Sequence, residues 1–285
     1  MQLRTMTEGD IAAGMWLKDL AGWNQTEADW KRFLGASRDG CFAVEVDGAV
    51  RGTAATIVYG GRFAWVGMVL VDPEYRGRGI GTKLLEKCIE HLDAIGVPCI
   101  KLDATPLGKP IYEKLGFAVE CELERWVLKR PPEQLRTAEQ LGPVEEMPAP
   151  LLEFVMKADR EAFGADRSTI LRSMHKEEPR FTDGLWNAGG MEGYALGRHG
   201  SFADHLGPWV AKDEESAARL LDRFLEQSVR ESVVVDCTQA NPFAKKLLQA
   251  RGFAFARPLT RMFRGLNQHP GRPDLVCAIV GPEFG

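Results

Sequence analysis

The chain has 285 residues and a net charge of −4, and 45% of its residues are hydrophobic and 27% charged. This length allows two domains with cores of ordinary size, and the slightly acidic balance excludes the overall positive charge typical of nucleic-acid-binding proteins. No apolar run approaches the roughly 18 residues of a membrane span, and residues 1–10 lack the apolar core of a signal peptide. We therefore expect a cytoplasmic protein without membrane or nucleic-acid partners.

The predicted secondary structure of the first half alternates helices and strands. In chain order it comprises a strand at 1–5, helices at 7–20 and 25–34, strands at 41–46, 50–59 and 63–71, a helix that includes 83–92, a strand at 99–104, a short helix that includes 111–115, and a strand at 119–129. Hydrophobic periodicity places Ile11, Met15 and Trp16 on one face of the first helix. Asn24 is suited to cap the second helix, and Asp47-Gly48 fits a tight hairpin turn.

A glycine-rich turn, Arg76-Gly77-Arg78-Gly79-Ile80-Gly81-Thr82, connects the strand at 63–71 to the following helix. Backbone N–H groups and the positive end of the helix dipole converge at such a turn. The glycines let the backbone approach a phosphate closely, and Arg76 and Arg78 add positive charge. The turn therefore predicts an anion-binding site, although the chain has neither a P-loop nor the GxGxxG dinucleotide fingerprint.

Two motifs carry a resemblance to a known family. Arg76-x-x-Gly79-x-Gly81 resembles the R/Q-x-x-G-x-G/A pyrophosphate loop of the GNAT acetyltransferase superfamily. Tyr112-Glu113-Lys114-Leu115-Gly116-Phe117 resembles the Y-x-K-x-G-F signature of the same family and follows in the expected order. The resemblance covers residues 1–130 and implies an acetyl-CoA-binding domain with a mixed, mostly antiparallel sheet flanked by helices.

The second half repeats the plan of the first. Residues 131–149 contain four prolines and no apolar period, which predicts a linker. In residues 150–285, the segments 206–213, 216–225, 233–237 and 241–253 parallel the strand, helix, strand and helix of the first copy. The chain thus resembles tandem GNAT proteins, and we expect an α/β fold of two GNAT-like domains.

The second copy lacks the residues on which the chemistry of the first would depend. Asp213-Glu214-Glu215-Ser216 replaces the glycine-rich turn, and these carboxylates would repel the phosphates of coenzyme A. Leu248 stands at the position of Tyr112, so the phenol is missing as well. We expect a degenerate, non-catalytic copy that packs on the first copy and shapes or covers the acceptor site.

The resemblance implies roles for particular residues of the first copy. Those expected to bind acetyl-CoA are Val69, Leu70, Val71, Arg76, Gly77, Arg78, Gly79, Ile80, Gly81, Thr82 and Thr105. Tyr112 would be the general acid that protonates the departing thiolate, because a phenol with a pKa near 10 keeps its proton at neutral pH. The alternative is a half-buried tyrosine that only packs.

A general base is harder to assign. Many GNAT enzymes carry a glutamate on the strand before the glycine-rich turn, whereas residues 63–71 contain no carboxylate. Asp103, near the end of the strand at 99–104, is the candidate base, and a turn or cap residue is the alternative. The cysteines, at positions 41, 88, 99, 121, 237 and 277, form no CxxC pair, and no histidine has zinc-ligand spacing, so we expect reduced thiols and no metal.

By the same resemblance, the first two helices border the acceptor, which makes Trp23, Asn24 and Gln25 the expected substrate-binding residues. Trp16, Trp23 and Trp30 either line an aromatic cleft that binds an amine by cation–π contacts or belong to the core. The sequence does not distinguish an amino acid, aminoglycoside, polyamine or protein lysine as the acceptor, nor a monomer from a homodimer.

The sequence therefore predicts an N-acetyltransferase that transfers the acetyl group of acetyl-CoA to a primary amine, most simply of a small molecule, by direct attack. The alternative is a non-catalytic acyl-CoA-responsive binding or regulatory protein. Retention of Tyr112 favours the enzyme, and the lack of a carboxylate in residues 63–71 favours the alternative.

Overall fold

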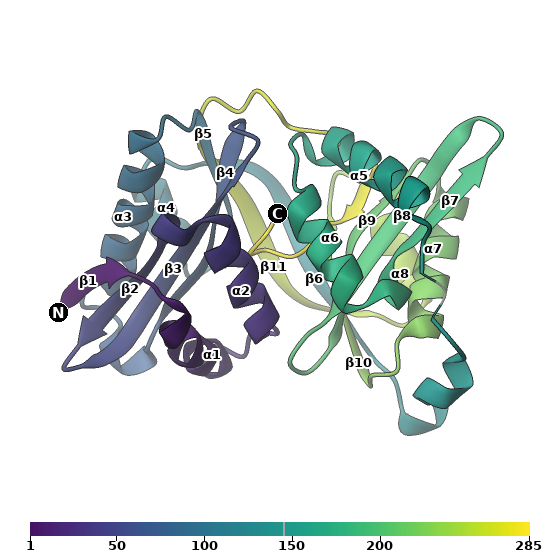
Figure 1. Ribbon diagram of the computed structural model, residues 1–285, viewed down its shortest axis with the longest axis horizontal. Helices are drawn as coiled ribbons and strands as arrows, with labels where there is room; N and C mark the ends of the chain where they lie inside the picture. The colour runs from purple at the N-terminus through teal and green to yellow at the C-terminus, as the bar shows by residue number, and fades with distance from the viewer. Residues whose placement is uncertain (145) are drawn as a thin grey trace. The chain divides into compact units, whose positions relative to one another are not determined.

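The computed structural model describes residues 1–144 and 146–285, except for the side chain of Ala138 (Figure 1). The chain forms two compact units that are not consecutive in sequence. The first unit comprises residues 1–120, 261–268 and 283–285, and the second comprises 121–260 and 269–282. Within the described ranges, no helix has the length and apolarity needed to cross a membrane.

The first unit contains a mixed, mostly antiparallel sheet, as predicted. Its elements are β1 (Gln2–Thr5), α1 (Ile11–Leu20), α2 (Glu27–Ala36), β2 (Cys41–Val46), β3 (Ala49–Tyr59), β4 (Phe63–Val71), α3 (Ile80–Ala94), β5 (Cys99–Ala104), α4 (Lys109–Lys114), the start of β6 (Ala118–Lys129) and the end of β11 (Ala254–Gly265). The strand order is β1-β2-β3-β4-β5-β11. Strands β1 to β4 pair antiparallel, and β4 pairs parallel to β5.

Helices cover both faces of this sheet. Ala64 and Val66 of β4 pack in one core cluster with Leu84 of α3. The next residue, Gly67, points to the other face, where an added Cβ would lie 3.0 Å from Phe33 of α2. Because successive residues of a strand face opposite sides, α3 covers one face of β4 and α2 the other.

Two predictions about the first helices were wrong. The N-cap of α2 is Thr26 rather than Asn24, because Asp29 at the third helical position accepts the Thr26 backbone N–H at 2.9 Å in a capping box. The buried face of α1 includes Gly14 instead of Trp16, which is 42% exposed. Gly14 is required there because the Trp30 ring lies 2.7 Å from the position of an added Cβ.

The second unit repeats the order of elements. They are the end of β6, α5 (Ala149–Phe163), α6 (Ser168–Glu177), β7 (Asp183–Asn187), β8 (Gly190–His199), β9 (Asp204–Ala211), α7 (Glu214–Gln227), β10 (Ser232–Thr238), α8 (Ala244–Ala250), the start of β11, and β12 (Val276–Ala278). The strand order is β11-β6-β10-β12-β9-β8-β7. The predicted linker 131–149 contains two short 3₁₀ turns, Pro132–Gln134 and Ala138–Leu141, and its residue 145 lies outside the described residues.

One long strand of each repeat, β6 in the first and β11 in the second, contributes residues to both units. Residues 121–129 of β6 belong to the second unit, where they pair antiparallel with β10. Residues 261–265 of β11 belong to the first unit, next to β5 in the strand order. The predicted domain boundary at residue 130 follows the end of β6, whereas the two units divide inside this strand.

Candidate active site

The glycine-rich turn is held at its start by Asp72. This buried carboxylate accepts the backbone N–H of Glu74 at 3.0 Å and a guanidinium N–H of Arg51 at 2.9 Å. Gly77 and Gly79 follow with φ of 76° and 79°, a left-handed conformation that glycine adopts without strain. Gly79 is the N-cap of α3 and no side chain caps this helix, so its first N–H groups are available to an anion.

Arg76 and Arg78 are exposed on this turn. Their hydrogen bonds are to backbone carbonyl groups, from Arg76 to Val71 at 3.4 Å and from Arg78 to Glu74 at 3.3 Å. Across the described ranges, neither guanidinium forms an ion pair with a carboxylate. Their positive charge therefore adds to that of the uncapped helix end, as the sequence predicts for an anion site.

Strand β4 is irregular immediately before the turn. It pairs with β5 only at Ala64 and Trp65, and its register with β3 shifts between Thr53 and Ala55. Met68, at this bulge, has a φ of 55°, and its carbonyl oxygen accepts the Thr53 hydroxyl at 3.0 Å. Val69–Val71 thus leave the pairing with β5, which is the geometry expected for a strand that offers backbone groups to a ligand.

Tyr112 lies on α4 and is half-buried. Its ring rests on Gly108, where an added Cβ would be 2.9 Å from Cε2, and its centroid is 6.1 Å from that of Phe117. Burial, together with nearby Cys88, raises the pKa of Tyr112 to about 12, so the phenol keeps its proton at neutral pH. No other described residue forms a hydrogen bond with its hydroxyl group, which leaves the group able to donate to a ligand.

The structure gives Asp103 a partner that the sequence did not indicate. Both carboxylate oxygens accept hydrogen bonds from Arg261 of β11, at 2.8 and 2.9 Å, and the Asp103 side chain is 0% exposed. The guanidinium also lies 4.6 Å from the centroid of the Trp65 ring. These contacts are those of a structural ion pair, and a role of Asp103 as a base remains an untested prediction. The Thr105 hydroxyl stabilises the turn that follows it, because it accepts the Gly108 N–H at 3.3 Å.

The residues expected to bind the acceptor lie in different surroundings. Trp23 is half-buried and Asn24 is 3% exposed. Gln25 is buried, and its amide nitrogen donates to the Glu283 carboxylate at 2.9 Å. Of the other tryptophans, Trp30 is fully buried in the core, whereas Trp16 is exposed. The three tryptophans therefore do not share one environment, and Trp30 is a core residue.

Residues 283–285 form part of the first unit, which sequence reasoning missed. An added Cβ at Gly67 would lie 2.6 Å from the carbonyl oxygen of Glu283. The Phe284 ring stacks on Phe33 with centroids 4.9 Å apart, and its carbonyl oxygen accepts the Tyr59 hydroxyl at 2.8 Å. The segment is thus fixed beside the β4 bulge on the face covered by α2. No sequence motif marks it, because each contact joins residues far apart in the chain.

In the second unit, the gap between the two parallel strands and the start of the following helix are filled by residues of the same unit. Strands β9 and β10 pair in parallel only up to Leu206, beyond which β12 lies between them. The Ala211 N–H donates to Leu275 and the Ile279 N–H to Asp236, both at 3.0 Å. At the start of α7, the Asp213 side chain accepts the Ser216 N–H at 2.7 Å. Backbone groups that could hold a ligand are therefore already paired.

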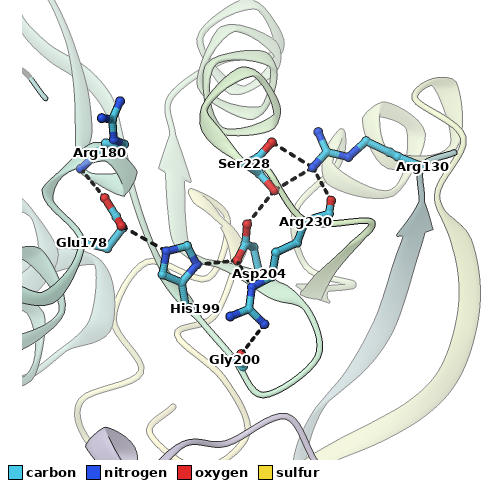
Figure 2. A network of polar contacts seen from close by, with 8 residues as sticks. All are labelled: Arg130, Glu178, Arg180, His199, Gly200, Asp204, Ser228 and Arg230. Atoms are coloured by element: carbon cyan, nitrogen blue, oxygen red, sulfur yellow. Dashed lines mark hydrogen bonds and ion pairs between the residues drawn. The ribbon is translucent and has the colours of Figure 1, made fainter. Parts of the chain in front are cut away.

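A polar network of the second unit contains a serine, a histidine and an aspartate, but they are not connected in the order that a catalytic triad requires (Figure 2). His199 lies between Asp204 at 2.6 Å and Glu178 at 3.0 Å. Ser228 donates its hydroxyl hydrogen to Asp204 at 2.7 Å and accepts from Arg130 at 2.7 Å. The serine is bonded to the carboxylate and not to the imidazole, so no base is placed to activate it as a nucleophile.

Five of the free cysteines are buried, and Cys121 is half-buried. Burial raises the pKa of the Cys41 and Cys237 thiols to about 12. Such thiols remain protonated at neutral pH and are poor nucleophiles. In the parts of the chain that are described, no cluster of histidine, cysteine and acidic side chains could hold a metal ion.

Comparisons with known proteins find acetyltransferase (GNAT) sequences in both halves of the chain. A model of the acetyltransferase (GNAT) family matches residues 12–117, and a model of an acetyltransferase (GNAT) domain matches residues 155–277. Holothin acyltransferase of Pseudoalteromonas sp. (strain SANK 73390) is 24% identical over 266 residues, covering 92% of this chain and 87% of that protein. The glucosamine 6-phosphate N-acetyltransferase of Trypanosoma brucei brucei is 30% identical over 131 residues, 41% of this chain and 88% of that enzyme.

The fold has relatives among solved structures. The crystal structure of a candidate acetyltransferase from Pyrococcus horikoshii superposes with a TM-score of 0.80 at 22% sequence identity, covering 100% of this chain and 95% of that chain. At this identity the likeness is one of fold. Together with the two family models and the Trypanosoma relative, it shows that the chain belongs to the GNAT family of acetyltransferases, with one family domain in each repeat.

Proposed function

We propose that the chain is an N-acetyltransferase that binds acetyl-CoA in its first repeat and acetylates a primary amine by direct attack. The observation that carries the proposal is the uncapped start of α3 beside two arginines that lack carboxylate partners among the described residues. Backbone N–H groups and guanidinium groups are the donors that bind a pyrophosphate best. Arg76, Gly77, Arg78, Gly79, Ile80, Gly81 and Thr82 supply them, and the pantetheine arm would follow Val69–Val71.

In this reaction the amine attacks the acetyl carbon and the thiolate departs. Tyr112 would donate the proton that the thiolate needs, since burial keeps its pKa above the neutral range. The bulge at Met68 would place backbone donors near the thioester carbonyl, where negative charge develops during the attack. The acceptor would approach from the side of Trp23, Asn24 and Gln25.

The second repeat would have no binding site for the acetyl donor, acetyl-CoA. Its counterpart of the glycine-rich turn is capped by Asp213, and β12 lies where the pantetheine arm would bind. An added Cβ at Gly207, which stands where Gly67 stands in the first repeat, would collide with the Ile279 carbonyl oxygen. A non-catalytic CoA-binding protein is the second candidate, favoured by the engagement of Asp103 with Arg261.

Calorimetric titration with acetyl-CoA tests the proposal before the acceptor is known. We expect one site per chain and loss of binding in Gly79→Val, because a β-branched side chain is strained at a φ of 79°. Release of coenzyme A with a panel of amines then separates the enzyme from the binding protein. Absence of binding would refute the donor site, and two sites per chain would refute the assignment of the second repeat.

A further inference from the structure

Four side chains of the first unit form a row that ends at the glycine-rich turn. The Arg51 guanidinium lies 5.9 Å from the centroid of the Trp16 ring and 4.7 Å from that of the Tyr75 ring. The Arg78 guanidinium in turn lies 4.7 Å from the centroid of Tyr75. A cation within about 6 Å of an aromatic centroid is attracted by the negative face of the ring. The row therefore links α1 and β3 to an arginine of the turn.

The two arginines of this row differ in their ionic partners. Arg51 donates to the buried Asp72 carboxylate at 2.9 Å. Arg78 forms no ion pair within the part of the chain that the structure describes, and its guanidinium also contacts the Glu74 carbonyl oxygen at 3.3 Å. Tyr75 is half-buried and packs against the core cluster between α3 and the sheet, which fixes its ring. The ring thus holds Arg78 while the positive charge of this arginine stays available to an anion.

The second repeat keeps the ion pair of this row but not its aromatic rings. In the first repeat, Asp72 donates its backbone N–H to the Arg51 carbonyl oxygen at 2.9 Å, and the two side chains pair. Lys212 makes the same backbone bond to Glu192 at 2.9 Å, and these side chains pair with their charges exchanged. Among the described residues, no aromatic ring lies over Lys212. The ion pair therefore joins two strand ends in both repeats, whereas the rings accompany the glycine-rich turn.

A mobile arginine loses side-chain entropy when it binds a phosphate. A side chain that is already held in place avoids part of this cost, so the ligand binds more tightly. We infer that Tyr75 is a positioning residue that holds Arg78 ready to bind a phosphate group of coenzyme A, an inference that rests on the proposed function. Because Tyr75 acts through Arg78, its contribution belongs to the affinity for acetyl-CoA.

Tyr75→Leu removes the ring and keeps an apolar side chain against the core. We expect the acetyl-CoA Kd, measured by calorimetry, to rise about two- to fivefold, the range that corresponds to one cation–π contact at an exposed site. Tyr75→Phe keeps the ring and should bind acetyl-CoA like the wild type. This conservative variant separates the effect of the ring from that of the phenolic hydroxyl group.

A double-mutant cycle identifies the partner of the ring. In the Arg78→Ala background, Tyr75→Leu should not raise the Kd further, because the side chain that the ring holds is gone. Arg76→Ala is the matched control, since Arg76 belongs to the same turn but does not lie over the Tyr75 ring. In that background Tyr75→Leu should keep its full effect.

Three outcomes would overturn the inference and leave the proposed function standing. They are an unchanged Kd in Tyr75→Leu, an effect of Tyr75→Leu that is as large with Arg78→Ala as without it, and an effect that disappears with Arg76→Ala as well. The last result would mean that the ring acts on the whole turn. Absence of acetyl-CoA binding by the wild type would instead refute the proposed function.

Fluorinated phenylalanines at position 75 give a test that preserves the shape of the ring. Fluorine withdraws electron density from the face of the ring and so weakens its attraction for a cation. We expect the acetyl-CoA Kd to rise stepwise with the number of fluorine atoms, whereas a ring that only packs would give one Kd throughout. If Tyr75→Leu does not fold, as judged by thermal melting, this series replaces it, and a constant Kd would overturn the inference.

Discussion

Asp103 and Arg261 are 158 residues apart in the sequence and form a buried, bidentate ion pair in the first unit. The second unit contains its counterpart, in which Arg125 donates twice to Asp236, at 2.7 Å each. In each case the aspartate belongs to a strand of one repeat, and the arginine belongs to β6 or β11 of the other. The pair therefore recurs in a repeat that lacks the glycine-rich turn and the tyrosine, which indicates a structural role.

This symmetry leads to a prediction about stability. Removing one partner of a buried ion pair leaves an uncompensated charge and costs about 3–5 kcal/mol. We expect Asp103→Asn and Asp236→Asn each to lower the free energy of unfolding by an amount of this order, measured by urea denaturation. If Asp103 were instead the base, Asp103→Asn would abolish turnover while leaving the unfolding curve close to that of the wild type.

Tyr112→Phe removes only the phenolic oxygen. We expect kcat to fall by about 10² or more, because the thiolate loses its proton donor, while the acetyl-CoA Kd stays the same. Steady-state kinetics and calorimetry measure the two quantities. Leu248→Met, at the equivalent position of the second repeat, is the control and should change neither. Equal turnover in Tyr112→Phe and the wild type would assign Tyr112 to packing alone.

The two ends of α3 offer a matched pair of glycine substitutions. Gly79 and Gly96 have φ of 79° and 73°, so alanine at either position costs roughly 1–2 kcal/mol of stability. Only Gly79 lies in the turn expected to bind the pyrophosphate. We expect similar losses in melting temperature and a weaker acetyl-CoA affinity in Gly79→Ala alone. A comparable loss of affinity in Gly96→Ala would mean that the turn acts only through helix stability.

His199 should make the stability of the second unit depend on pH above 6.5, the usual pKa of an imidazole. Its hydrogen bond to Asp204 raises the pKa of the imidazole above the usual 6.5, and Glu178 acts in the same direction. A group with a raised folded-state pKa stabilises fully below its unfolded pKa and loses this contribution as pH rises through the folded value. Melting temperature should therefore fall as pH rises from 6.5 through that value, and His199→Gln should flatten this fall.

His205 should act in the opposite direction at lower pH. Burial lowers its pKa from 6.5 to about 4, so the folded protein keeps the ring neutral while the unfolded chain takes up a proton. Stability should decline as pH falls from 6.5 towards 4. Thermal melting across this range measures the effect, which His205→Gln should reduce. A stability curve that is flat between these values would contradict the assignment.

The sequence by itself determined the local structure and the family motifs. The Asp47-Gly48 turn, the left-handed glycines before α3 and the order of helices and strands follow from backbone preferences and short hydrophobic periods. These signals act over a few residues, which is why they could be found without the fold. Even there, the sequence did not decide between Asn24 and Thr26 as a helix cap, because each has an acidic residue three positions later, and only the structure shows that the capping box forms at Thr26.

Only the tertiary structure decided which distant segments complete each site. The alternation of apolar and polar residues along β6, β11 and β12 is compatible with pairing to many different strands. It could therefore not indicate that β12 lies between β9 and β10, or that Arg261 of β11 binds Asp103. Likewise, nothing in residues 283–285 marks them as neighbours of Gly67. Strand pairing and side-chain packing depend on the shape of the assembled chain, whereas a turn or a helix start depends on the residues that form it.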